Sequence, residues 1–502
     1  MTDNIQHLLH GFAIALTGYH IVLMLLGVLL GILVGVLPGL GAPNGVSLLL
    51  PLTFSMDPIS GIILLTSMYW GALFGGSTTS ILFNIPGEPS SVATTFEGYP
   101  MARMGRATEA LTLAFLSSGF GALFGVVLVT LLAGPATRFA LLFSPVEYFS
   151  VFLLAFASFV AFGGGSPMKT IVSIGLGLAF ASVGMDGVSG SMRLTFDLPD
   201  LVRGISFLVV VIGLFGLGEL LETMQSPYTA EPVASRLDPR EVVRTIIAWP
   251  RYWVALLRSA LIGCWMGITP GGPTAASFMS YGVARRVSRN RANFGKGEPV
   301  GLVSPETADQ AAGSAAILPM LTLGLPSSAT AAVLLGGLMM WGVTPGPSLF
   351  KERPDFVWGL IASMYVSNVV AVILVLATVP IFAAILRVPL AIIAPIIAIV
   401  CVVGAWTVAG APFDLLLLLI FGVAGFVMKK LDYPIAPLVL AMVLGDRAED
   451  AFRQSMLLSH GNLLVFFTSP LAGTLSTLAV ICFLAPLFGS LKAQFPSTRP
   501  TP

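Results

Sequence analysis

A short polar motif, Gly-x-Pro-Ser-Ser, occurs twice in a chain that is otherwise strongly apolar. It occupies residues 87–91, within the stretch NIPGEPSSVAT (84–94), and residues 324–328, with the sequence GLPSS. Proline and glycine interrupt helices, and a serine after the interruption is well placed to cap the next helix. The first amides of a helix have no partner inside it and lie at the positive end of its dipole, so they bind anions. The motifs therefore predict an anion site that needs no lysine or arginine.

The predicted substrate-binding residues are the glycines and serines of both motifs, with amide and hydroxyl side chains nearby. They are Gly87, Ser90, Ser91, Gly324, Ser327, Ser328, Asn44, Thr94 and Thr330. Each interruption also exposes carbonyl oxygens at the end of the preceding half-helix, and such carbonyls coordinate Na⁺ in transporters. The predicted ion-binding residues are Ser77, Thr79, Asn84, Ser314 and Thr322. Beyond Na⁺, we expect no metal, no cofactor and no catalytic residue.

Three acidic residues lie in or close to the interrupted segments. Glu88 is part of the first motif, and Glu306 and Asp309 precede the second. A carboxylate at membrane depth is a candidate for ion or proton coupling, because burying an unpaired charge there is costly. The alternative is a solvated cap at the membrane interface. Glu219 and Asp414 are expected to mark the ends of spans.

The elements that position these residues are predicted to be transmembrane helices. The chain has 502 residues, of which 56% are hydrophobic and 10% charged, whereas soluble domains carry about 25% charged residues. A net charge of +1 gives no electrostatic support for nucleic-acid binding. We predict an all-α polytopic membrane protein with about ten to twelve spans, some broken or re-entrant. Clear candidates are 20–37, 107–133, 145–163, 168–185, 200–222, 252–269, 357–386, 391–409, 412–428 and 463–488.

The sequence repeats itself at an offset of more than two hundred residues. GVLLGILVGVLPGLG (27–41) matches SALIGCWMGITPGGP (259–273), with small residues at every fourth position and a Pro-Gly break after them. Such stripes allow close helix packing in a bilayer. We therefore predict two halves, 1–225 and 251–502, joined by a cytoplasmic linker at 226–250. Interrupted segments at matched positions of two halves indicate the binding site of a secondary transporter, and an elevator-like movement is one hypothesis.

Basic residues predict the orientation of the chain in the membrane. No lysine or arginine precedes Arg103, and the densest basic cluster lies at 285–296. The simplest topology places the N-terminus outside and the C-terminus inside, so the two halves would have inverted topology. The three cysteines, Cys264, Cys401 and Cys482, lie far apart in apolar runs, where they are expected to be small buried hydrophobes.

Four blocks of the sequence resemble the large membrane subunit of the tripartite tricarboxylate transporter family. They span 35–54, 69–107, 184–205 and 305–347, and include GVLPGLGAPNG, NIPGEPSSVATTFEGYP and PETADQAAGS. The resemblance implies the substrate-translocating subunit of a bacterial inner-membrane importer. Its implied partners are a small membrane subunit of about four helices and a periplasmic solute-binding protein; a homodimer is a further expectation. Implied substrates are carboxylates such as citrate, taken up with an ion gradient, commonly Na⁺. The chain agrees in having no GxxxxGK[ST] phosphate loop.

Three other functions compete with a carrier. GVSG (187–190) matches the Gly-x-Ser-Gly pattern of intramembrane serine proteases, but Ser189 would need a base, and the stretch around it is polar. Hydroxyl-lined breaks could also form the pore of a carboxylate-selective channel. A purely structural membrane subunit would not explain two matched Pro-Ser-Ser breaks.

Overall fold

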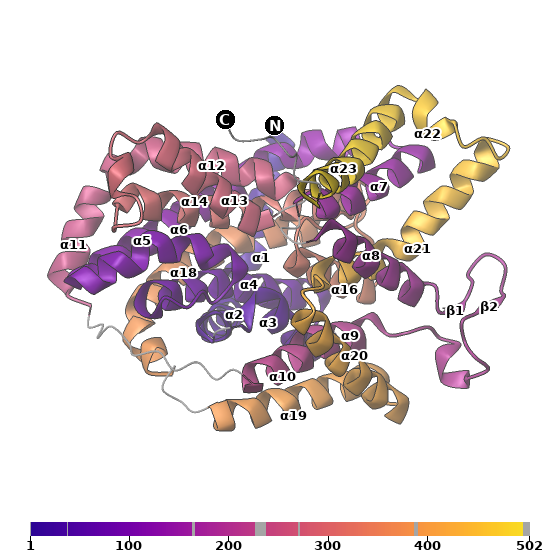
Figure 1. The fold of residues 1–502 in the computed structure, drawn as a ribbon, viewed down its shortest axis with the longest axis horizontal. Helices are drawn as coiled ribbons and strands as arrows, with labels where there is room; N and C mark the ends of the chain where they lie inside the picture. Colours follow the sequence, from indigo (N-terminus) through magenta and orange to yellow (C-terminus); the bar gives the residue numbers. More distant parts are fainter. Residues whose placement is uncertain are drawn as a thin grey trace, which may run out of the picture. The chain divides into compact units, whose positions relative to one another are not determined.

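The computed structural model of the chain describes residues 2–37, 39–162, 166–225, 237–269, 272–385 and 390–494. Almost all of the regular structure in these ranges is helical (Figure 1). The helices are α1 Thr2–Ala15, α2 Gly18–Val36, α3 Gly41–Leu49, α4 Pro58–Phe83, α5 Val92–Met101, α6 Ala107–Ala140, α7 Pro145–Phe162, α8 Pro167–Ala181, α9 Phe207–Val211, α10 Gly218–Gln225, α11 Pro239–Ala248, α12 Trp253–Ile268, α13 Gly272–Val287, α14 Pro299–Ala315, α15 Ile317–Leu323, α16 Ala329–Met340, α17 Leu349–Glu352, α18 Pro354–Ile385, α19 Leu390–Ala409, α20 Pro412–Lys430, α21 Ile435–Leu458, α22 Val465–Thr468 and α23 Pro470–Gln494. A two-stranded antiparallel hairpin, β1 Gly184–Met185 and β2 Met192–Arg193, is the sheet structure of the described residues.

Six of the described helical segments are long and apolar enough to cross a membrane. They are Gly18–Val36, Pro58–Phe83, Pro89–Ala140, Phe207–Gln225, Pro354–Ile381 and Pro412–Lys430. Five shorter apolar helices accompany them, at Pro145–Ala161, Pro167–Ala181, Ala329–Met340, Ile392–Thr407 and Pro470–Pro486. The predicted class, an all-α polytopic membrane protein with some broken helices, is confirmed.

The chain forms two compact units. Unit 1 comprises Met1–Ala140 and Leu208–Phe426, and unit 2 comprises Leu141–Phe207 and Val427–Pro502. Both interrupted motifs belong to unit 1. The division of the sequence into two halves around a linker at 226–250 stays a prediction. Residues 226–236 of that linker lie outside the described residues, and α11 occupies most of the remainder.

Glycine stripes bring two pairs of helices in unit 1 into backbone contact. α2 packs on α4, and α12 packs on α14. A Cβ atom at Gly35 would lie 2.0 Å from the backbone oxygen of Ala72, and one at Gly267 would lie 2.3 Å from that of Ala312. Both stripes predicted from the repeat therefore form close helix contacts, each against the helix that leads to an interruption.

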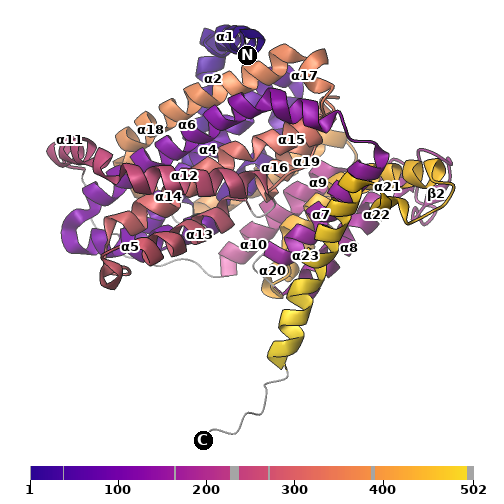
Figure 2. The same cartoon turned by 90° about the horizontal axis from the view of Figure 1, so that it is seen from above.

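Helix α14 lies at the centre of unit 1. It contacts α5, α6, α12 and α13, and every residue from Gly301 to Ala315 is buried. Figures 1 and 2 show α12, α13 and α14 side by side. Because α14 carries Glu306 and Asp309, this placement buries both carboxylates among helices.

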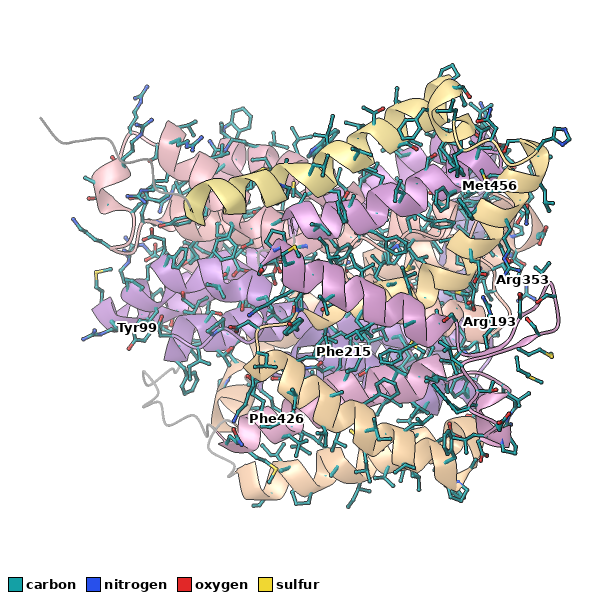
Figure 3. All side chains as sticks on the ribbon, turned by 45° about the vertical axis from the view of Figure 1, so that its right-hand side comes forward. Tyr99, Arg193, Phe215, Arg353, Phe426 and Met456 are labelled. Atoms are coloured by element: carbon teal, nitrogen blue, oxygen red, sulfur yellow. The ribbon has the colours of Figure 1, made fainter. Side chains whose placement is uncertain are left out.

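Unit 2 is built from α7, α8, α21 and α23, with the β1–β2 hairpin beside α21. Figure 2 shows α23 running along α7, and Figure 3 labels Arg193 on the hairpin and Met456 on α21. Arg193 pairs with Glu449 at 2.9 Å and Arg453 with Asp186 at 3.0 Å. The Arg453 guanidinium holds the pKa of Asp186 well below its usual range. These ion pairs join the hairpin to α21.

Candidate functional site

The first interruption separates α4 from α5. Helix α4 ends at Phe83, and Asn84 adopts a left-handed conformation with φ 59°. Residues Pro89–Ser91 form a single 3₁₀ turn, η2, and α5 begins at Val92. The helix therefore stops where the Pro-Gly-x-Pro sequence predicted, and the two serines lie at the start of the next helix.

The second interruption has the same order of elements. Helix α15 ends at Leu323, and Gly324 is left-handed with φ 68°, a conformation that suits glycine. Ser328 is the N-cap of α16, and its hydroxyl accepts a hydrogen bond from the Ala331 amide at 3.2 Å. This is the capping geometry expected for a serine at this position.

The two serines of each motif have different environments. Ser91 Oγ donates to the Glu88 carbonyl at 2.9 Å and accepts from the Glu88 amide at 3.2 Å. Like the Ser328 hydroxyl, the Ser91 hydroxyl therefore hydrogen-bonds backbone atoms of its own turn. Ser90 and Ser327 are 3% and 2% exposed, and their hydroxyls have no hydrogen-bond partner among the described residues. A buried, unpaired hydroxyl at a matched position of each motif indicates a place for a ligand or water.

Residues beyond the Pro-Gly breaks approach the serine motifs. α13, which follows the second Pro-Gly break, contacts η2, and α3, which follows the first, contacts α16. A Cβ at Gly272 would lie 3.0 Å from the Ser328 Cβ. Each serine motif is thus contacted by a helix from the other half of the sequence. Pro38, Pro270 and Gly271 lie outside the described residues.

The carboxylates of Glu88 and Glu219 lie beside the start of α3. Glu88 is 7% exposed, and its Oε1 accepts a hydrogen bond from the Ala42 amide at 2.6 Å. Asn44 donates to the Gly39 carbonyl at 3.0 Å and to Glu219 Oε2 at 3.4 Å. Glu219 was expected to mark the end of a span, but it is buried within the segment Phe207–Gln225 and belongs to this polar region.

Glu306 on α14 is held by hydroxyls from three other helices. Ser77 on α4 donates to Oε2 at 2.9 Å and Ser118 on α6 at 2.7 Å, while Thr94 on α5 donates to Oε1. Ser77 and Thr94 were expected to bind ion and substrate respectively. Both hydroxyls donate to the Glu306 carboxylate, which is 2% exposed, and their predicted roles in binding stay predictions.

Asp309, one turn further along α14, is less well satisfied. It is 3% exposed, its Oδ1 makes no hydrogen bond within the described residues, and the Ser90 hydroxyl lies beside it. The Tyr69 hydroxyl lies next to Ser328, interacts electrostatically with Asp309 and Glu88, and is itself unpaired. Tyr69 on α4 thus lies beside the second interruption, and Asp309 on α14 lies beside the first.

The structure places the remaining predicted residues as follows. Thr79 and Thr322 donate to carbonyls of their own helices, those of Gly76 and Leu318. Asn84 is exposed. Ser314 is buried and unpaired within the described residues, and Thr330 is buried. Gly87 is buried against α2, where a Cβ would meet the Gly35 carbonyl at 2.1 Å.

Glu97 is a buried acidic residue that the sequence did not single out. Its Oε1 accepts from Tyr281 Oη at 2.9 Å and the Gly295 amide at 2.5 Å. Its Oε2 accepts from the amides of Gly297 and Glu298, both at 2.8 Å. The carboxylate therefore joins α5 to the loop between α13 and α14. The only sequence signal was an acid in a mostly uncharged stretch.

The serine-protease reading gains no support from Ser189. This residue lies in the turn between β1 and β2, and its hydroxyl donates to Asp186 Oδ2 at 2.7 Å. Among the described residues it hydrogen-bonds Asp186, Ser191 and no histidine.

Comparison with known proteins identifies one family. The model of the tripartite tricarboxylate transporter TctA family matches residues 21–440. The chain is 36% identical over 499 residues, 98% of each chain, to an uncharacterized 52.8 kDa protein in the TAR-I ttuC' 3'region of Agrobacterium vitis. It is 35% identical over 233 residues to an uncharacterized protein in the TAR-II ttuC' 3'region of the same organism, covering 46% of this chain and 96% of the relative. No solved structure matches.

Proposed function

This chain belongs to the tripartite tricarboxylate transporter TctA family, and from that premise we propose that it is the substrate-translocating subunit of an ion-driven carboxylate importer. Membership makes it a multi-pass membrane subunit of a tripartite transporter. The proposed cargo is a tricarboxylate such as citrate or a related carboxylate. The driving force is an ion gradient, with Na⁺ as the coupling ion.

One observation supports the carboxylate site above all others. Ser90 and Ser327 are buried, unpaired and located where a new helix begins. A carboxylate has two oxygens that accept hydrogen bonds, and it is stabilised by hydroxyls and amides at helix N-termini. Neither motif contains a lysine or arginine, so hydroxyls and amides would supply the binding energy. Ser328 caps α16 with its hydroxyl, and the Ser91 hydroxyl bonds the Glu88 backbone just before α5, so both stabilise the turns that hold Ser90 and Ser327.

The remaining parts of the proposal follow from the family and the charge pattern. The protein resides in a bacterial inner membrane with its N-terminus in the periplasm and its C-terminus in the cytoplasm. A small membrane subunit of about four helices and a periplasmic solute-binding protein complete the complex, and the chain forms a homodimer. Thiol labelling from each side of the membrane, after cysteines are introduced near Gly18 and at 285–296, tests the orientation.

The two interrupted segments are proposed to move together across the membrane, as in an elevator. Crosslinks between introduced cysteines that fix α4 and α14 to an outer span should stop transport without unfolding the protein. Undiminished uptake in the crosslinked complex contradicts the movement and leaves the binding site untouched.

The decisive experiment is uptake of labelled carboxylates by the complete complex in proteoliposomes. Ser90→Ala and Ser327→Ala each remove a hydrogen bond to a charged group, worth about 1.5–3 kcal/mol, so each should lower uptake efficiency about tenfold or more. Ser55→Ala, at an exposed position in unit 1, is the matched control. Wild-type kinetics in the double variant would refute the site. Non-saturable flux that is independent of the binding protein would favour a channel.

A further inference from the structure

The Asp309 carboxyl group is buried, and the described residues supply no cation to pair with it. It is 3% exposed, its Oδ1 accepts no hydrogen bond, and the described residues place no lysine or arginine in an ion pair with it. Its charged neighbours, Glu306 and Glu88, are both acidic. An isolated carboxylate in the protein interior is strongly destabilising unless a cation or a proton accompanies it.

Buried hydroxyls next to Asp309 are unpaired as well. Ser90 and Tyr69 are 3% and 1% exposed, and neither hydroxyl has a hydrogen-bond partner in the described parts of the chain. Ser90 lies beside the Asp309 side chain, and Tyr69 lies close enough to interact with it electrostatically. A Cβ at Gly313, one turn beyond Asp309 on α14, would lie 3.1 Å from the Tyr69 hydroxyl. One carboxylate and two hydroxyls therefore lie in the same buried region between α4, η2 and α14.

The composition of this cluster favours a monovalent cation. Hard cations bind oxygen ligands, and a hydroxyl can donate its proton to the carboxylate while it offers a lone pair to the ion. A proton on Asp309 could be shared with one hydroxyl oxygen, whereas a cation can contact the carboxylate and both hydroxyl oxygens at the same time. No group of three acidic, histidine or cysteine side chains close enough to hold one metal ion occurs in the described residues, which disfavours divalent metals.

We propose that Asp309, Ser90 and Tyr69 bind the Na⁺ ion whose entry permits carboxylate binding. This rests on the proposed function, because Ser90 also belongs to the substrate site. A substrate carboxylate near Ser90 faces the negative charge of Asp309 when the cation site is empty. Na⁺ cancels that repulsion and shares Ser90 with the substrate. The cation therefore binds before the anion, and the two are transported together.

The test is Na⁺ binding to the purified full-length chain in detergent, without carboxylate. Binding of ²²Na⁺ and the Na⁺-dependent rise in unfolding temperature are measured, with K⁺ and N-methylglucamine at equal ionic strength. The wild type should bind Na⁺ saturably. Asp309→Asn should weaken Na⁺ binding at least tenfold, and Ser90→Ala and Tyr69→Phe several-fold each. Asp355→Asn, the same change at an exposed site of unit 1, should leave it unchanged.

Wild-type Na⁺ affinity in Asp309→Asn overturns the proposal, as does equal stabilisation by all three cations. If Asp309→Asn does not fold, Ser90→Ala and Tyr69→Phe decide the question, and unchanged affinity in both overturns it. Carboxylate uptake separates this proposal from the function. If the wild type takes up carboxylate with Na⁺ while Asp309→Asn binds Na⁺ as tightly as the wild type, the Na⁺ site is refuted and the proposed function stands. If Na⁺ binding depends on Asp309 but the complex transports no carboxylate, the proposed function is refuted and the Na⁺ site stands. Uptake driven by a pH gradient without Na⁺ would assign the site to a proton and overturn the proposal.

Discussion

Replacing Glu97 by glutamine should loosen the loop between α13 and α14. The carboxylate accepts four hydrogen bonds, from Tyr281 Oη and the amides of Gly295, Gly297 and Glu298. In its best orientation, the glutamine oxygen still accepts hydrogen bonds from the amides of Gly297 and Glu298, and its NH₂ group donates to the Tyr281 hydroxyl. That NH₂ group then opposes the Gly295 amide, which in the native structure lies 2.5 Å from Oε1.

The expected cost follows from this geometry. The part-buried Gly295 amide loses its acceptor, and the other three hydrogen bonds lose the strength that the charge gives them, at about 1–3 kcal/mol together. A total of about 2 kcal/mol raises the population of the open loop about thirtyfold. Glu97→Ala, which leaves all four donors without their acceptor, should have the larger effect.

Trypsin reports the opening, because the loop and its flanks carry Arg289, Arg291 and Lys296. When cleavage is slow relative to reclosing, its rate follows the population of the open form. Glu298→Gln is the matched control, since it removes a charge from the same loop and keeps the Glu298 amide that Glu97 accepts. The control Glu298→Gln should be cleaved at the wild-type rate. If Glu97→Gln is also cleaved at the wild-type rate, the Glu97 carboxylate does not hold the loop and the reasoning fails.

Two further predictions concern helix packing and pH. Gly35→Ala places a Cβ 2.0 Å from a backbone oxygen of α4. It should lower the free energy of unfolding by about 1–3 kcal/mol, measured as a lower unfolding temperature in detergent. Gly18→Ala is the control, because no atom lies within 4 Å of its Cβ, and equal effects of the two variants would contradict the close contact. Because Arg453 lowers the pKa of Asp186, their pairing stabilises the hairpin fully above the usual aspartate pKa of about 4 and is lost only as pH falls through the lowered value. Amide hydrogen exchange in the hairpin, corrected for its intrinsic pH dependence, should therefore accelerate in acid in the wild type. In Arg453→Gln the exchange should be fast already at neutral pH. Slow exchange in that variant would contradict the role of the Arg453–Asp186 pair.

The interruptions were predictable because their causes are local. Single prolines such as Pro135 and Pro305 lie inside helices, but a proline close to a glycine followed by two serines marked both breaks correctly. The all-α polytopic class followed from composition. Helix α4 was harder to recognise, because its glycines and hydroxyl residues lower its hydropathy although nearly the whole helix is buried.

The roles of individual side chains depended on residues distant in sequence. The sequence predicts Ser77 and Thr94 as ligand-binding residues, but it does not reveal that both donate to Glu306, more than two hundred residues away. Which serine of each pair stays unpaired depends on the backbone geometry of the turn, which composition does not reveal. Glu97 was missed for the same reason, since its four donors come from another part of the chain.

The contacts of Glu306 limit how this protein can change shape. One carboxylate on α14 ties together hydroxyls from α4, α5 and α6, so a slip of any of these helices by one turn, about 5.4 Å, would separate the bonded atoms. Separating these helices would thus leave the buried Glu306 carboxyl group without its hydrogen-bond partners. Any change of shape that keeps Glu306 bonded to Ser77, Thr94 and Ser118 must therefore move α4, α5, α6 and α14 together as one rigid body.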